Sequence, residues 1–179
     1  MPTDVRTCLL FLAVAVAVAG VTACGQRAEP LGELQQPYPV TVQGAGDAPT
    51  VLESKPERIV ALDPGSAELV IALGAGDRLV GIPAGIEQGD RPRQAPPSAK
   101  QVVSENLRIR VDEIIELEPD LLIATPATDQ LDVGRLETET GAPLYVQPSA
   151  SIDDVLRATL QLGFIVGEPV EARTVASRI

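Results

Sequence analysis

The sequence predicts an α/β fold in which helices cover both faces of a parallel β-sheet. Short apolar runs alternate along the chain with segments whose apolar residues recur at helical spacing. Pro or Gly bounds most of these runs, so each has the length of a strand that is buried on both faces. Hydrophobic residues make up 45% of the chain and charged residues 22%, a composition typical of a globular domain. Strands that alternate with helices imply right-handed crossovers and therefore a parallel sheet.

Residues 1–23 have the pattern of an export signal. The apolar run from Cys8 to Ala23 follows Arg6 and is shorter than the roughly 20 residues that a membrane-spanning helix needs. Small residues precede Cys24, as in the bacterial lipobox, in which a lipid is attached to the cysteine and the peptide is cut just before it. We therefore expect Cys24 to be the lipidated first residue of an exported chain, anchored in the cell membrane and facing the periplasm or the cell exterior. The alternative is an ordinary secretory signal with an incidental cysteine.

Composition argues against several classes of chemistry. The chain has two cysteines, and Cys8 lies in the segment to be removed, so the exported protein can form no internal disulfide. Histidine is absent and the processed chain is expected to keep no free thiol, which excludes Ser-His-Asp and Cys-His catalysis and the usual nitrogen and sulfur ligands of zinc. The formal net charge of -11 does not suggest the positively charged surface that binds nucleic acid. We expect no enzyme, no resident cofactor or metal and no nucleic-acid partner, although a metal site made of carboxylates alone is compatible with the composition.

The expected elements follow in order. Residues 24–37 are polar, carry Gly, Pro and Gln without periodicity, and fit a flexible tether. Two alternating runs around Val40–Val42 and Thr50–Leu52 flank a Gly-rich turn, which predicts a hairpin. Residues 58–62 (RIVAL) form the first buried strand, and we expect Ser66 to cap the helix that follows it.

The middle of the chain continues the alternation. Residues 79–82 (LVGI) predict a strand, and residues 83–104, rich in Pro, Gly and Gln, predict an irregular loop. A short helix is expected over 111–118, with Asp112 as its N-cap and Pro119 at its end.

The pattern in the last part of the chain predicts a strand over 120–124 (DLLIA), a helix over 129–140 and a strand over 144–147 (LYVQ). Ser151 and Asp154 then approximate a capping box, with Asp in place of Glu, before a further helix.

Polar and turn-forming residues follow the predicted strands, and ligands of parallel α/β sheets bind beyond the carboxyl ends of the strands. After the first strand, backbone N–H groups and the positive end of a helix favour an anionic or carbonyl-bearing ligand. The alternative is that these loop residues only turn the chain and cap the helix, and that the others are ordinary loop polarity. The candidate ligand-binding residues are Asp63, Pro64, Gly65, Ser66, Pro83, Thr125 and Gln147.

Three stretches, in this order, carry a family resemblance: KPERIVALDPGSAELVIALGAGDRLVGI, VDEIIELEPDLLIATPA and GAPLYVQPSASIDDVLRATLQLGFIVGE. Together, behind a lipobox, they resemble the iron-siderophore and vitamin B12 substrate-binding proteins of ABC importers. The resemblance implies two α/β lobes joined by one long helix, with the ligand between the lobes. It implies a ferric siderophore or a corrinoid as the ligand and the permease subunits of an ABC transporter as the protein partner.

The resemblance also sets the expected domain limits. Residues 38–167 correspond to the N-terminal lobe, and residues 168–179 look like the first turns of the inter-lobe helix, with Pro169 suited to its start. No C-terminal lobe follows in the sequence. The chain is therefore expected to be either a fragment of a longer protein or the product of a truncated gene, and the sequence does not decide between them.

Members of the resembled family dock onto the permease through an acidic residue on each lobe. The corresponding position here is Asp112, with Glu113 adjacent and Glu105 as the nearest competitor. The alternative is that Asp112 only caps its helix. Arg91 and Arg93, in the long loop, are able to reach an acidic chelate, although solvated surface charge is the simpler interpretation.

Three functions are compatible with these sequence features. The first is a lipid-anchored substrate-binding component of an ABC importer. The second is an enzyme, but the glycines of GAGDRLVG (74–81) end a helix before a strand, the reverse of the context that a dinucleotide loop requires. The third is a truncated surface lipoprotein that acts as an interaction module without transport.

Overall fold

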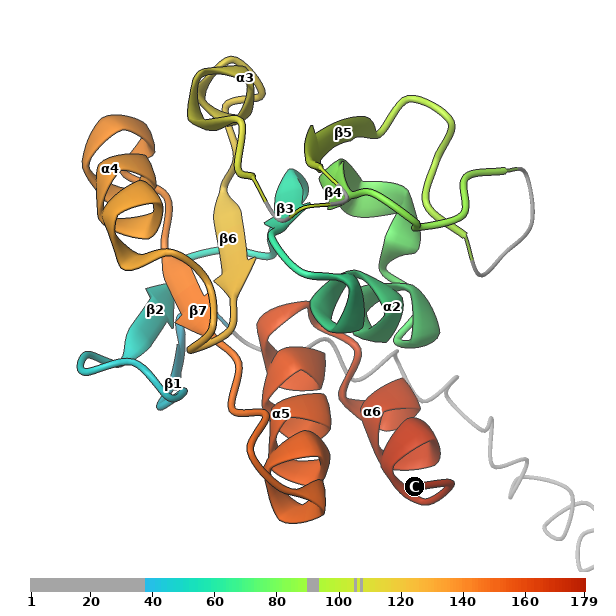
Figure 1. Cartoon of the computed structure of the whole chain (residues 1–179). Helices are drawn as coiled ribbons and strands as arrows, with labels where there is room; N and C mark the ends of the chain where they lie inside the picture. The colour runs from blue at the N-terminus through green and yellow to red at the C-terminus, as the bar shows by residue number, and fades with distance from the viewer. Residues whose placement is uncertain (1–37, 90–93, 105, 107) are drawn as a thin grey trace, which may run out of the picture. The chain divides into compact units, whose positions relative to one another are not determined.

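The computed structural model describes residues 38–179 except 90–93, 105 and 107 (Figure 1). The predicted signal peptide, the predicted lipidation site Cys24 and the tether lie outside the described residues, as do Arg91, Arg93 and Glu105. The described residues belong to one structural unit. None of the described helices has the length and apolar character needed to cross a membrane.

A five-stranded parallel sheet, in the order β5-β4-β3-β6-β7, forms the centre of this unit. The predicted strands are confirmed, with their bounds at β3 (Ile59–Ala61), β4 (Leu79–Pro83), β6 (Leu121–Ala124) and β7 (Leu144–Val146). The prediction of an irregular loop over 83–104 is wrong in part, because β5 (Lys100–Val103) lies within it. Its two last residues alone are buried and it pairs only with β4, so it has the weak apolar signal of an edge strand.

Helices cover both faces of the sheet, as predicted (Figure 1). Successive strand residues alternate between two core clusters: Ile59 packs with α2 (Pro64–Ala72), α5 (Ile152–Ile165) and α6 (Pro169–Ala176), whereas Val60 packs with α3 (Val111–Ile115) and α4 (Gln130–Thr140). This alternation follows from the two-residue period of a strand. It explains why the central strands are apolar without interruption.

Two predicted helix caps are wrong. Asp63, not Ser66, is the N-cap of α2, and its side chain accepts a hydrogen bond from the Ser66 backbone N–H. Pro64 begins the helix because its fixed φ suits the first turn, which moves the start three residues toward the N-terminus. Asp112 is not the cap of α3 either: Arg110 occupies that position without a side-chain cap, and the helix ends at Ile115, earlier than predicted.

The caps of α4 and α5 are residue types that favour these positions. Asp129 caps α4 by accepting hydrogen bonds from two backbone N–H groups, and Gly141 ends the helix with a φ of 64°. Ser151 caps α5 by accepting from the Asp154 backbone N–H. The side chain of Asp154 bonds to Arg157, so only one half of the expected capping box forms. A short 3-10 helix, η1 (Gly76–Arg78), leads into β4.

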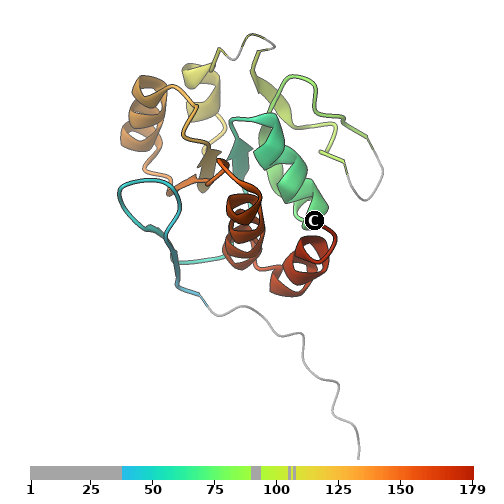
Figure 2. The same cartoon turned by 60° about the horizontal axis from the view of Figure 1, so that its bottom comes forward.

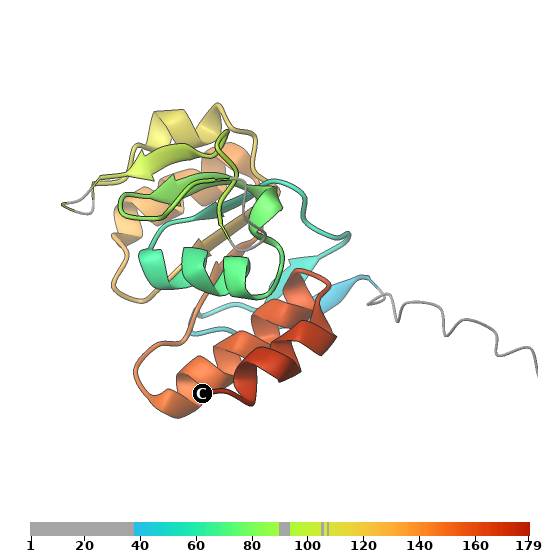
Figure 3. The same cartoon turned by 90° about the vertical axis from the view of Figure 1, so that its right-hand side faces the viewer.

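α5 and α6 pack side by side on the outer layer (Figures 2 and 3). Pro169 stands in the first turn of α6, where the sequence predicts the start of a helix. Gly167, with a φ of 74°, allows the chain to reverse between the two helices. At the same junction Glu168 forms ion pairs with Lys55 at 3.1 Å and Arg78 at 3.6 Å.

The predicted hairpin is confirmed as the antiparallel pair β1 (Val40–Val42) and β2 (Thr50–Leu52). It runs along the outer edge of β7, where the backbone N–H of Ala45 donates to the Val146 carbonyl at 2.7 Å and the Thr50 hydroxyl donates to the Leu144 carbonyl at 2.6 Å. An uncovered sheet edge is a template for pairing with another chain. The hairpin therefore protects an edge that would otherwise be open.

Candidate functional site

The carboxyl edge of the sheet brings together three of the predicted site residues, Asp63, Ser66 and Gln147. Asp63 and Ser66 belong to the turn from β3 into α2, and Gln147 follows β7 directly. β6 lies between these two strands in the sheet, so the Gln147 side chain reaches past the end of one strand to meet Ser66. The backbone N–H of Gln147 donates to the Ala124 carbonyl at 2.7 Å, which fixes where its side chain begins.

Ser66 is the centre of this cluster and is fully buried. Its backbone N–H donates to Asp63 Oδ1 at 2.9 Å, and its hydroxyl also lies within hydrogen-bond distance of Asp63 Oδ2. The same hydroxyl oxygen lies 3.1 Å from Oε1 of Gln147, at the distance of a hydrogen bond donated to that oxygen. Gln147 is 6% exposed, whereas Asp63 is half-buried. The cluster thus combines a carboxylate, a hydroxyl and an amide that their own contacts hold in fixed positions.

The other predicted ligand residues take different places on the same edge. Pro64 and Gly65 are exposed in the first turn of α2. Thr125 is half-buried after β6, and its backbone N–H donates to the Thr128 hydroxyl at 3.0 Å. Pro83 is buried as the last residue of β4, beside Val103 of β5, so it supports the edge from within the sheet.

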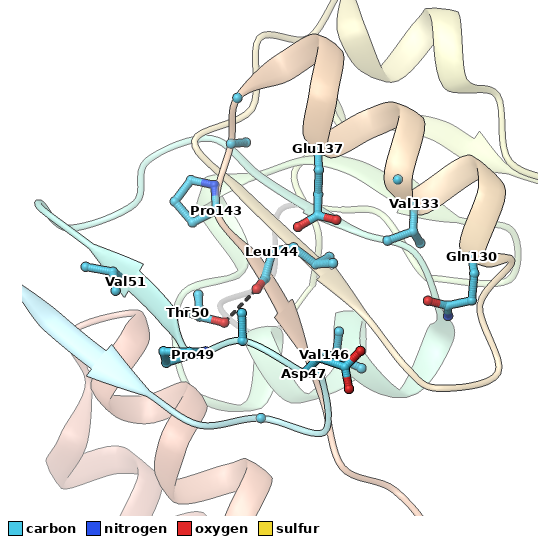
Figure 4. Close-up of a pocket in the computed structure, with 16 residues that line it drawn as sticks. Asp47, Pro49, Thr50, Val51, Gln130, Val133, Glu137, Pro143, Leu144 and Val146 are labelled. Atoms are coloured by element: carbon cyan, nitrogen blue, oxygen red, sulfur yellow. Dashed lines mark hydrogen bonds between the residues drawn. The ribbon is translucent and has the colours of Figure 1, made fainter.

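A concave region lies beside β7 (Figure 4). A cavity of about 510 Å³ opens between the hairpin turn, α4 and β7. Val133 and Leu144 contribute apolar surface. Asp47, from the hairpin turn, and Glu137, from α4, contribute carboxylates. None of the predicted ligand residues lines it. Sequence reasoning missed this cavity because it joins segments about ninety residues apart that carry no shared motif.

The predicted docking residues lie on the surface of α3. The Asp112 side chain is 83% exposed, and its Oδ1 pairs with Nη2 of Arg135 at 2.7 Å. Glu113 pairs with Lys100 at 3.3 Å and with Arg110 at 3.5 Å. The carboxylates are therefore accessible but each already faces a cation. Arg135 in particular was not foreseen, because it comes from α4 and no local pattern links it to Asp112.

Titratable and metal-binding chemistry is sparse in the described part of the chain. Within it, no three His, Cys, Asp or Glu side chains are grouped so that they could hold a metal ion. Among the resolved shifts, burial raises the pKa of Tyr38 to about 12 and also raises the pKa of Tyr145 above its usual range. Both phenols donate hydrogen bonds as neutral groups, to the Ile165 carbonyl and to Gln161 respectively.

The family follows from comparison with known proteins. The family model described as periplasmic binding protein matches residues 59–179, which is more than half of the chain. The chain therefore belongs to the periplasmic binding protein family. The matched region contains all of the predicted ligand residues and both predicted docking residues.

Individual relatives agree with this assignment. The vitamin B12-binding protein of Vibrio parahaemolyticus is 29% identical over 127 residues, which cover 71% of this chain and 44% of the relative. An uncharacterised ABC transporter substrate-binding lipoprotein of Bacillus subtilis is 27% identical over 120 residues, covering 64% of this chain and 36% of the relative. The solved structure of the iron uptake ABC transporter substrate-binding protein PiuA from Streptococcus pneumoniae is 29% identical with a TM-score of 0.61, covering 79% of this chain and 50% of that one. The chain thus spans half or less of the length of these relatives.

Proposed function

We propose that this chain is the N-terminal lobe of a substrate-binding component of an ABC importer, whose cargo is a corrinoid or a ferric siderophore. The observation that carries the proposal is that the family match includes the whole carboxyl edge, where Asp63, Ser66 and Gln147 converge. Relatives in the same family are named for vitamin B12 binding and for iron uptake. A sheet edge with a fixed polar cluster suits one wall of a cleft for such a chelate.

The second wall would come from a further lobe. The relatives are at least twice as long as the part that this chain matches, which supports a second lobe joined through the helix that begins at Pro169. Residues 38–167 would then form the first lobe. In this proposal Pro64, Gly65 and Thr125 line the same wall as the central cluster, and Pro83 supports that wall from within the sheet.

Anchoring and docking complete the proposal. Cys24 would carry the lipid that holds the protein at the outer surface of the membrane, and the Bacillus subtilis lipoprotein supports this because it belongs to the same class. Asp112 and Glu113 would meet arginines of the permease, since both carboxylates are accessible on α3.

The test begins with the protein extracted with detergent from its native membrane. Intact mass establishes the length of the mature chain and the presence of acyl groups, and Cys24→Ala should release the protein from the membrane fraction. Calorimetric titration of the same material with cyanocobalamin and with a ferric trihydroxamate should give a dissociation constant of about 1 μM or tighter for one of them. A mature protein of one lobe that binds neither chelate would contradict transport and favour the interaction module.

A further inference from the structure

The hydroxyl of Ser66 lies between two groups that both need a hydrogen. Its Oγ contacts Asp63 Oδ2 on one side and Gln147 Oε1, 3.1 Å away, on the other. A serine hydroxyl has one hydrogen to donate, and a carboxylate can only accept. The hydrogen therefore goes to Asp63, because a hydrogen bond to an ionised acceptor is the stronger of the two.

This assignment fixes the orientation of the Gln147 amide. With its only hydrogen committed to Asp63, Ser66 Oγ can interact favourably with Gln147 only by accepting. A half-turn of the terminal torsion of glutamine exchanges its oxygen and nitrogen without moving the rest of the side chain. In the structure Oε1 faces Ser66, so this half-turn exchanges the two atoms, presents Nε2 to Ser66 and turns Oε1 away from it.

The outward atom of Gln147 reaches the surface. The side chain makes one hydrogen bond within the described protein, the contact with Ser66. In the described part of the chain no fully buried side-chain nitrogen or oxygen lacks a partner. The second amide atom of Gln147, although its residue is only 6% exposed, is therefore accessible at the carboxyl end of β7.

The charged residues described around these two acceptors are mostly acidic. The described parts of the loops after β3, β4, β6 and β7 and the first turn of α5 contain no Lys or Arg. Basic residues do follow β5, at the opposite end of the sheet from β7: Arg108 and Arg110. The acidic residues in the described parts of these loops and in this turn are Asp63, Glu87, Asp129, Asp153 and Asp154.

We infer that this wall of the cleft presents hydrogen-bond acceptors, the carboxylate of Asp63 and the Oε1 of Gln147, and so selects a chelate whose periphery carries N–H donors. Amide-bearing corrinoids and ferric hydroxamates with an ammonium arm have such a periphery. A polyanionic carboxylate or catecholate complex would place its own negative charge against the carboxylate of Asp63 and the Oε1 of Gln147. The inference rests on the proposed function, whose cargo class it narrows.

The decisive variant is Asp63→Asn. Asparagine caps a helix about as well as aspartate, so α2 should still form. Its Oδ1 keeps the bond to the Ser66 backbone N–H, which places Nδ2 against the Ser66 hydroxyl. Ser66 then releases its hydrogen to Gln147, whose amide turns and presents Nε2 to the cleft. The matched control is Asp129→Asn, which removes the same charge from the N-cap of α4 and leaves the Gln147 amide alone.

The experiment titrates full-length protein with cyanocobalamin, a cationic ferric trihydroxamate and a trianionic ferric tris-catecholate. Wild type should prefer one of the first two to the tris-catecholate by about tenfold or more. Asp63→Asn should reduce that preference by about fivefold to tenfold, the value of one to two hydrogen bonds, and Asp129→Asn by less than twofold. A tris-catecholate that binds best, or equal effects of the two variants, would overturn the inference.

A second measurement separates this outcome from failure of the proposed function. In nitrogen-15-labelled wild type, the side-chain NH₂ of Gln147 should show a nuclear Overhauser cross-peak to the Ser66 β-protons, and Asp63→Asn should weaken it. Absence of this cross-peak in wild type overturns the assignment of Oε1 as the outward acceptor. A protein that binds none of the probes contradicts the proposed function, and the cross-peak then still decides which atom Gln147 presents.

Discussion

Gly163 of α5 and Ala172 of α6 lie so close that no side chain fits between them. A Cβ built on Gly163 would stand 2.2 Å from the Cβ of Ala172 and 3.2 Å from the Glu168 carbonyl oxygen. This contact allows the two helices to pack backbone to backbone. It also fixes the direction in which α6, the proposed start of the inter-lobe helix, leaves the lobe.

We predict that Gly163→Ala lowers the free energy of unfolding by about 1–3 kcal/mol, because the methyl group forces α5 and α6 apart. This loss should appear although alanine is the better helix former by about 1 kcal/mol. Urea denaturation followed by circular dichroism measures it. The control is Gly134→Ala in α4, where nothing lies within 4 Å of the added Cβ. That variant should be as stable as wild type or more so, and similar losses in both variants would contradict the packing argument.

The hairpin contact with β7 gives a second prediction. Thr50→Val removes the hydroxyl that bonds to the Leu144 carbonyl and leaves a partly buried acceptor without its partner, at a cost of about 1–2 kcal/mol. It also loosens the cover of the sheet edge, so the variant should form more soluble aggregate on heating. The control is Thr41→Val in the same hairpin, because Thr41 is exposed and should change neither property. Denaturation and light scattering report the two effects, and a neutral Thr50→Val would show that the hydroxyl contributes nothing.

The strands and most helices were predictable because their signals are local. Strands such as Ile59–Ala61 and Leu121–Ala124 are buried on both faces, so an unbroken run of apolar residues is enough to identify them in the sequence. β5 was missed because an edge strand with two buried residues looks like loop. The cap of α2 was misplaced because Asp63 and Ser66 are both good N-caps and the choice depends on Pro64, which can begin a helix.

The candidate site was predictable in place but not in detail. The rule that ligands bind at the carboxyl ends of parallel strands pointed to the loops that hold Asp63 and Gln147. The contact of Ser66 with Gln147 depends on strand order, since β6 separates the two loops, and strand order is not written in any short motif. The pairing of Asp112 with Arg135 was hidden for the same reason.

The docking proposal leads to a third prediction. Charge reversal at both positions, Asp112→Lys with Glu113→Lys, should reduce permease-dependent uptake at least tenfold, because repulsion replaces the attraction that guides encounter. Stability should change by less than about 0.5–1 kcal/mol, since exposed ion pairs contribute little. The control is Glu139→Lys, which removes the other partner of Arg135 and leaves α3 intact. The importer must first be shown to depend on this protein. Normal uptake in the double variant would then refute docking at α3.

The two tyrosines give a pH prediction, and they are the only two in the chain. Desolvation by burial is the largest cause that raises the pKa of Tyr38 to about 12, with Arg78 opposing it and Glu168 and Glu57 adding to it. Desolvation likewise raises the pKa of Tyr145, with Arg157 opposing it. Above a pH of about 10 the unfolded chain loses the phenolic protons while the folded chain retains them, so the folded state binds more protons and stability falls as pH rises.

The free energy of unfolding should therefore be independent of these phenols below about pH 10 and should decline from there toward about pH 12. Denaturation at a series of pH values measures the slope, and phenolate absorbance should rise together with unfolding rather than before it. Tyr145→Phe and Tyr38→Phe each lose a hydrogen bond, so they are less stable at neutral pH, but each should show a shallower decline above about pH 10. Phenolate absorbance that rises in the folded protein near the usual pKa of tyrosine would show that solvent reaches these side chains and that burial does not hold their protons.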